Sequence, residues 1–325
     1  MLDLIHAIAG RPWAIQAEIA LHVRGLLAKE GLAGLRHLAA LKAEIHAFDD
    51  AARAAAGGPT RPGSVGTVAV VPVIGTLAQR AEMVGSAETR STAAVAAEIR
   101  AAAMEPSVDA ILMDIASPGG EVFGVPEAFA SIRESARMKP VVAFANSMAA
   151  SAALYLASAA SEVWVTPSGL IGSLGVFVLH VDASKALEQM GESWEFIVAT
   201  KSPYKVEGNP AGPLSDEARA NAQSRIDHYM AMFVGDVAKG RGVSVAKVEA
   251  DFGQGRMLTP ADAVKAGMAD AIGTFDKAIR RAADLSRTPS GGRRTRAEVF
   301  QDAPQAADPA ELAARARLAG IKVEG

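Results

Sequence analysis

Short apolar runs separated by turn residues dominate the middle of the chain. Residues 67–74 (TVAVVPVI) and 109–115 (DAILMDI) are almost continuously apolar, as expected of strands that are covered on both faces of a parallel sheet. Segments 92–104 and 126–138 are predicted to be helices, and a further apolar run begins at residue 141. The order strand, helix, strand, helix, strand predicts an α/β protein with a mainly parallel sheet.

The uncharged stretch 140–181 is the most distinctive part of this pattern. We expect a strand over 141–145 that ends at Asn146, then a tight turn, an alanine-rich helix, a strand, a glycine turn and another strand. Ser151 stands among alanines where that helix should begin. A helix N-terminus offers unpaired N–H groups and a partial positive charge, so it favours an alkoxide or oxyanion. A buried Ala/Ser helix that only packs closely would give the same pattern.

The same stretch must also be tested as a membrane span. Residues 140–161 carry no charge and are about as long as the roughly 20 residues that a spanning helix needs. The segment consists mostly of Ala and Ser, opens with Pro140 and is interrupted by Asn146. We therefore predict that it belongs to the core of the domain and that the chain has no membrane anchor.

The second half of the chain continues the alternation of strands and helices. Residues 195–199 (EFIVA) predict a strand, and 201–210 predict a loop because they are rich in Pro, Gly and Asn. Ser215 is expected to cap a long helix that ends at Gly240. Two shorter helices follow, at 245–252 and 260–266. Gly273 is expected to make the last turn of the domain.

The ends of the chain differ from its middle. Residues 1–63 predict an N-terminal helical extension and linker, with one apolar helix face formed by Ile15, Ile19, Val23 and Leu26. Residues 64–286 form the main domain. Residues 287–325 predict a flexible basic linker and a short C-terminal helix.

Composition removes several classes of function. Of 325 residues, half are apolar and 21% are charged, and the net charge of -3 gives no sign of a nucleic-acid partner. The absence of cysteine excludes disulfides, thiol catalysis and cysteine-ligated metal. The six histidines are scattered without a metal-binding pair, so no metal is expected. The first residues lack the pattern of a signal peptide, and we expect a cytoplasmic protein.

A candidate catalytic site follows from the strand ends. Gly119-Gly120 lies just after one strand and Ser151 after the next, and ligands of open α/β sheets bind at the carboxyl ends of strands. Glycine lets the backbone turn its N–H groups towards a substrate carbonyl. A serine nucleophile also needs a base. Lys205 and Lys201 in the loop and His180 at a strand end are the candidates, and these residues alone leave the choice open.

Four motifs in order make the sequence resemble a known family. They are Ser117-Pro-Gly-Gly120, Met148-Ala-Ala-Ser151-Ala, Ile171-Gly-Ser-Leu-Gly-Val176 and Tyr204-Lys205-Val-Glu-Gly-Asn-Pro210. Together they closely resemble the signal peptide peptidase A family, and most closely its phage branch, the protein C-type capsid assembly proteases. The resemblance covers roughly residues 65 to 280.

The resemblance implies a fold, a reaction and a role for each site residue. The fold would be the Clp protease/crotonase-like α/β superhelix. The activity would be that of a serine endopeptidase that works through an acyl-enzyme with no cofactor or metal. The implied nucleophile is Ser151 and the general base is Lys205. Ser173 would orient the lysine, and Gly119 and Gly120 would form the oxyanion hole.

The resemblance also implies partners, and several alternative functions stay open. We expect a homo-oligomer that acts on a polypeptide, either a scaffold or capsid protein or a signal peptide. A phage portal or scaffold protein is a further expected partner, with the procapsid as a second location. The alternatives are a cytoplasmic peptidase that degrades signal peptides and an inactive structural component of the phage shell. Two further rivals are a Ser/His/Asp triad with His180 and the acyl-CoA chemistry of crotonases.

Overall fold

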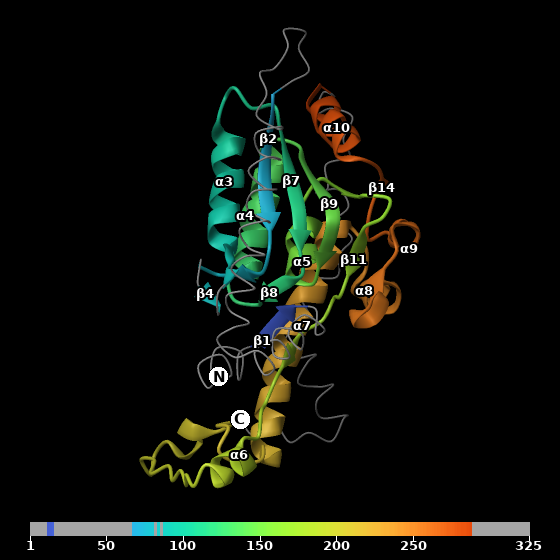
Figure 1. The fold of residues 1–325 in the computed structure, drawn as a ribbon. Coiled ribbons are helices and arrows are strands. Elements are labelled where there is room, and N and C mark those ends of the chain that lie inside the picture. Colours follow the sequence, from blue (N-terminus) through green and yellow to red (C-terminus); the bar gives the residue numbers. More distant parts are fainter. Residues whose placement is uncertain (1–11, 16–66, 81–82, 85–86, 288–325) are drawn as a thin grey trace, which may run out of the picture. The chain divides into compact units, whose positions relative to one another are not determined.

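A computed structural model describes residues 12–15, 67–80, 83–84 and 87–287 (Figure 1). Its central sheet contains a run of five parallel strands, β2–β7–β9–β10–β14. Their bounds are β2 Val68–Ile74, β7 Ala110–Ser117, β9 Val141–Ala150, β10 Glu162–Val165 and β14 Ala271–Ile272. The prediction of an α/β protein with a mainly parallel sheet is therefore confirmed.

Strand β9 changes its neighbour along its length. Residues Val142–Ala145 pair with β10, whereas Met148–Ala150 pair with β11 (Leu170–Gly172), which in turn pairs antiparallel with β13 (Met257–Leu258). The prediction that this strand ends at Asn146 is therefore wrong. Pairing with β11 continues the strand to Ala150, so β9 leads directly into Ser151.

Helices cover both faces of the sheet (Figure 1). Successive side chains of β7 point to opposite faces of the sheet. Ile111, Met113 and Ile115 belong to the large core cluster on one face. On the other face, Ala110 and Leu112 pack with Ala278 and Ala282 of the helix that spans Phe275–Arg287. The large core includes side chains from α3 Thr92–Met104, α4 Val125–Met138, α5 Ala152–Ser158, α7 Asp216–Arg241, α8 Val245–Asp251 and α9 Pro260–Ala266.

The opposite face of the sheet carries α10 (Phe275–Arg287). This helix packs on β7 and β9, so the fold continues past Gly273, which was predicted to make the last turn of the domain. The helices predicted at 92–104, 126–138, 245–252 and 260–266 are confirmed within one residue. The Ser215 cap is also confirmed, because its side chain accepts a hydrogen bond from the Ala218 amide.

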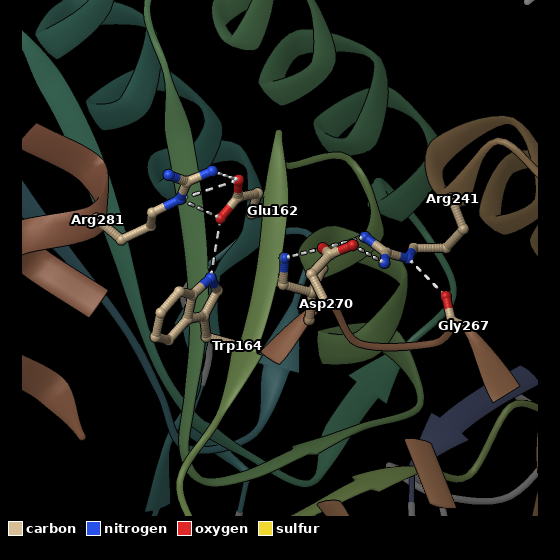
Figure 2. Close-up of polar contacts among 7 residues, drawn as sticks. Glu162, Trp164, Arg241, Gly267, Asp270 and Arg281 are labelled. Atoms are coloured by element: carbon tan, nitrogen blue, oxygen red, sulfur yellow. Dashed lines mark hydrogen bonds and ion pairs between the residues drawn. The ribbon is translucent and has the colours of Figure 1, made fainter. Parts of the chain in front are cut away.

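Two arginines fix the helices against the outer strands, as Figure 2 shows. Arg241 at the end of α7 binds both carboxylate oxygens of Asp270, and Asp270 also accepts the Val163 amide at 2.7 Å. On the other side of β10, Arg281 of α10 binds both carboxylate oxygens of Glu162. Strand β10 and the segment before β14 are thus held to α7 and α10.

A second, smaller sheet lies beyond the end of the first. Its strand order is β12–β1–β8–β3–β6, with β12 Phe177–Val178, β1 Pro12–Ile15, β8 Gly119–Glu121, β3 Leu77–Ala78 and β6 Arg90–Ser91. A separate hairpin pairs β4 Met83–Val84 with β5 Ala87–Glu88. The prediction of helix is wrong for Pro12–Ile15, which form strand β1. The other helices predicted for 1–63, and the segment 288–325, lie outside the described residues.

Residues 179–215 form an arm beside the first half of α7 (Figure 1). The arm contains the short helix α6 (Ser184–Gln189) and the 3-10 turn η1 (Pro203–Val206). The strand predicted at 195–199 is wrong, since these residues have no regular structure and the Ile197 side chain is 93% exposed. Among the helices that the structure describes, none combines the length and apolar character needed to cross a bilayer.

Candidate active site

Ser151 lies on a tight connection between β9 and α5. It is fully buried and has φ 54 and ψ -116, a backbone conformation that residues other than glycine rarely adopt. Its amide donates to the Gly172 carbonyl at 2.8 Å and its carbonyl accepts from the Tyr155 amide. Such strain persists only where surrounding contacts impose it, and it is concentrated at functional sites.

The Ser151 hydroxyl is available for chemistry. Its Oγ donates a long hydrogen bond of 3.4 Å to the Gly175 carbonyl, and it makes no hydrogen bond that caps α5. A hydroxyl with only a weak acceptor can turn towards another base at little cost. The predicted position of Ser151 at the start of a helix is confirmed.

Ser173 lies beside Ser151. Gly172 pairs with Ala150 in the parallel β9–β11 register, so the next residues along the two strands are neighbours. Ser173 also has φ 54, and its amide donates to the Arg256 carbonyl at 2.9 Å. The structure thus brings together two of the predicted site residues, each with a strained backbone.

The predicted oxyanion glycines lie in β8, against α5. Ser117, two residues before β8, pairs with Ala149, which lies two residues before Ser151. The Gly119 amide, however, donates to Ser117 Oγ at 3.2 Å, and Ser117 Oγ donates to the Gly75 carbonyl. Gly119 would have to release this bond before its N–H could serve an oxyanion. A Cβ on Gly120 would lie 1.8 Å from the Leu77 carbonyl oxygen, so only glycine fits there.

Lys205 is not brought to Ser151 within this chain. It lies exposed in η1, next to Tyr204, which donates to Glu217 in the first turn of α7. At the other end of α7, Asp236 accepts from the Tyr155 hydroxyl at 2.6 Å. Glu217 and Asp236 are about 28 Å apart along the helix axis. Since Tyr155 belongs to the first turn of α5, the lysine and the serine lie far apart.

The other candidate bases are also remote from Ser151. The His180 ring contacts the Gly212 carbonyl at 3.2 Å inside the arm. Lys201 is exposed at the turn before η1. Neither residue contacts Ser151 in the described part of the chain, so the geometry gives no support to a Ser/His/Asp triad within one chain.

An apolar pocket beside α5 was not predicted from the sequence. It lies between β8, α4, α5 and α7 and is lined by Val122, Val125, Pro126, Tyr155, Val176, Tyr229, Met232 and Phe233. Tyr155 stacks on Phe233, and burial raises the pKa of its hydroxyl, which stays protonated and donates to Asp236. The pocket is formed by residues far apart in sequence, and no local motif marks it. In the described part of the chain, no group of three or more His, Cys, Asp or Glu could hold a metal ion.

Comparison with protein families identifies the domain that contains this site. Residues 133–288 match the model of peptidase family S49, and the chain therefore carries a peptidase S49 domain over this range. The matched range contains Ser151, Ser173 and Lys205 and begins after the two glycines of β8. The predicted resemblance to signal peptide peptidase A and its phage branch is confirmed.

Curated relatives include proteins of phages and bacteria. The capsid assembly protease C of Escherichia phage lambda is 36% identical over 234 residues, which cover 70% of this chain and 52% of that protein. The head-tail preconnector protein GP5 of Enterobacteria phage P21 is 34% identical, over 66% of this chain and 42% of that protein. Protease 4 of Salmonella typhi is 29% identical over 75% of this chain and 38% of that protein. The chain thus spans about half the length of the first two relatives, or less.

Solved structures with a similar chain include two mutants of the 1510-N membrane-bound stomatin-specific protease. One replaces a serine by alanine, and the other replaces a lysine by alanine and is in complex with a substrate peptide. Both have a TM-score of 0.41 and 16% sequence identity and cover 66% of this chain. The matches cover 84% and 78% of those chains.

Proposed function

We propose that this protein is a serine endopeptidase in which Ser151 is the nucleophile and Lys205 the general base. The observation that carries the proposal is the strained, buried Ser151 between Ser173 and the β8 glycines, within an S49 domain. A serine held at a strand-to-helix turn beside backbone donors is the arrangement that acyl transfer requires.

The reaction would proceed in two steps. Neutral Lys205 takes the Ser151 proton as Oγ attacks the substrate carbonyl, and the oxyanion accepts hydrogen bonds from the β8 amides. Lys205 then protonates the leaving amine, the C–N bond breaks and an acyl-enzyme remains. Water, deprotonated by Lys205, attacks the ester carbonyl, the ester C–O bond breaks, and Lys205 returns the proton to Ser151 Oγ as the carboxylic acid product leaves. Ser173, next to the nucleophile in the strand register, would hold the lysine amine through its hydroxyl.

The position of the arm adds a condition to this mechanism. Because the length of α7 separates Lys205 from Ser151 in one chain, we propose that Lys205 of a second copy completes the site. The arm exposes large apolar side chains, among them Trp194, Phe196 and Ile197, which are 40%, 44% and 93% exposed. Such a surface favours association with another copy. This agrees with the homo-oligomer expected from the family resemblance.

A complementation experiment tests the dyad and its assembly together. Ser151→Ala and Lys205→Ala should each lower hydrolysis of an unfolded protein substrate by at least about 10³-fold, while Lys201→Ala should keep wild-type activity. Co-expressing the two inactive variants should restore about a quarter of the activity, because a quarter of randomly formed interfaces join an intact serine to an intact lysine.

Each outcome has one meaning. Full activity of Lys205→Ala would refute the lysine as base and make His180→Ala the next variant to measure. Two inactive variants that stay inactive together would refute completion of the site by a second copy. Labelling of Ser151 by a fluorophosphonate would argue against acyl-CoA chemistry.

For the biological substrate, we propose a protein of phage head assembly. The support is the 36% identity to a phage lambda protein that is named as a capsid assembly protease. A scaffold or capsid protein would be the substrate, a portal or scaffold protein the further partner, and the procapsid the place of action. Purified wild-type protein that cleaves signal peptides but no head protein would favour the signal-peptide alternative. Protein with no activity on either would favour an inactive shell component.

A further inference from the structure

Strands β8 and β12 form a slot that is one strand wide. They do not pair with each other in the strand order β12–β1–β8–β3–β6, and β1 alone joins them. On one side Pro12 and Trp13 pair with Val178 and Phe177. On the other side, residues Trp13–Ile15 pair antiparallel with β8. Without β1, both β8 and β12 would present unpaired backbone groups to an incoming peptide.

Both walls of this slot belong to the proposed active site. β8 consists of Gly119, Gly120 and Glu121, and β1 places Ile15 opposite Gly119 and Ala14 opposite Gly120. β12 begins two residues after Gly175, whose carbonyl is the acceptor of the Ser151 hydroxyl. A strand in the slot therefore runs past the nucleophile between the two segments that flank it.

The lining of the slot indicates which peptides it accepts. Val122 directly follows β8 and Val176 directly precedes β12, and both line the apolar pocket with Tyr155 and Tyr229. Strand addition supplies affinity through the main chain, whereas neighbouring pockets select side chains. The slot thus fits an extended apolar peptide, and the sequence Pro-Trp-Ala-Ile of β1 has this character.

We propose that β1 occupies the position of the substrate strand, so that residues 12–15 are an internal competitor for the active site. The inhibition of hydrolysis by β1 rests on the proposed peptidase function. The occupation of the slot by β1 can be tested by peptide binding, without hydrolysis. A tethered segment competes at an effective concentration that reaches the order of 1 mM. A substrate of ordinary affinity would have to displace β1 before it could reach Ser151.

The test uses the full chain with Ser151→Ala, which prevents cleavage of any peptide. Ala14→Pro removes one backbone N–H in the middle of β1, and proline is not tolerated in a strand that is paired on both sides. Ala14→Ser keeps the N–H and is the matched control. The probe is a fluorescent peptide with the sequence of residues 10–17, measured by anisotropy. The Ala14→Pro protein should bind it about tenfold more tightly than the Ala14→Ser protein. Ile15→Pro is the second variant if Ala14→Pro fails to fold.

The same pair of variants with Ser151 intact gives an independent kinetic result. Ala14→Pro should lower the KM for a peptide substrate about tenfold and leave kcat unchanged, as expected when a competitive inhibitor is removed. Equal peptide binding by the proline and serine variants would overturn the proposal, even if the enzyme is active. Tighter binding by the proline variant, with no hydrolysis by any variant, would leave the slot standing and refute the peptidase function.

Discussion

The strained backbone of Ser151 predicts that glycine at this position costs less stability than glycine elsewhere in the core. We consider the variants Ser151→Ala and Ser151→Gly, both of which lack the hydroxyl. Alanine keeps a Cβ at φ 54, whereas glycine adopts this conformation without strain. A residue held in such a sparsely populated region costs about 1–3 kcal/mol, which only the glycine variant recovers.

This gain in the free energy of unfolding must be compared with the loss that a change from alanine to glycine causes at a buried position without strain. Removing one buried methyl group costs about 0.8 kcal/mol, and the extra chain entropy of glycine costs about 0.5–1 kcal/mol. Ala157, fully buried in α5 and with no strained backbone, gives this ordinary cost directly. In the Ser151→Ala protein, Ala157→Gly should therefore lower the free energy of unfolding by about 1.5 kcal/mol. At position 151, the change from alanine to glycine should cost about 1–3 kcal/mol less, so the two variants should be of similar stability or glycine the more stable.

Urea unfolding of the three proteins measures both differences, provided that their m-values agree. The comparison does not depend on any activity, because every protein in it lacks Ser151. An equal loss at positions 151 and 157 would refute the reasoning and show that the turn at Ser151 stores no strain.

Two further predictions concern contacts that support the site. Gly120→Ala places a Cβ 1.8 Å from the Leu77 carbonyl oxygen, so it should lower the free energy of unfolding by about 2–3 kcal/mol. Gly212→Ala, with no atom within 4 Å of the added carbon, should change it by less than about 0.5 kcal/mol, and equal losses in urea unfolding would contradict this argument. Arg241 has a side chain only 4% exposed, so Arg241→Met should cost about 2–3 kcal/mol. Arg281 makes a similar two-oxygen contact with a side chain 43% exposed, so Arg281→Met should cost less than about 1 kcal/mol; a smaller loss for Arg241→Met would show that burial does not decide the value of these pairs.

The sequence predicted the sheet because its signals are local. The apolar runs at 67–74 and 109–115 and the small residues around Ser151 depend on neighbours within a few positions. The predicted end of β9 was wrong because the sequence signal used for it was also local. Asn146 is a turn former in isolation, but the pairing of Met148–Ala150 with β11, set by residues 170–172, extends the strand past it.

Features that depend on long-range pairing could not be predicted. The segment 195–199 has the composition of a strand, yet no strand among the described residues pairs with it and Ile197 remains exposed. Strand β1 pairs across more than 100 residues with Gly119–Glu121, and nothing near Pro12 indicates this. Ser151 and the adjacent Ser173 were predicted from motifs, whereas the separation of Lys205 from them follows from the length of α7.

Helix α7 links these observations in one physical argument. Its second half is fixed to α5 through Phe233 and Asp236, and its first turns hold the arm through Glu217. A helix of 26 residues is a spacer of about 39 Å, so the arm cannot reach Ser151 of its own chain unless this helix breaks. If Lys205 is the base, a second copy must therefore bring it. Strand β1 must also leave the slot before a substrate enters, so activity would require both assembly and release of residues 12–15.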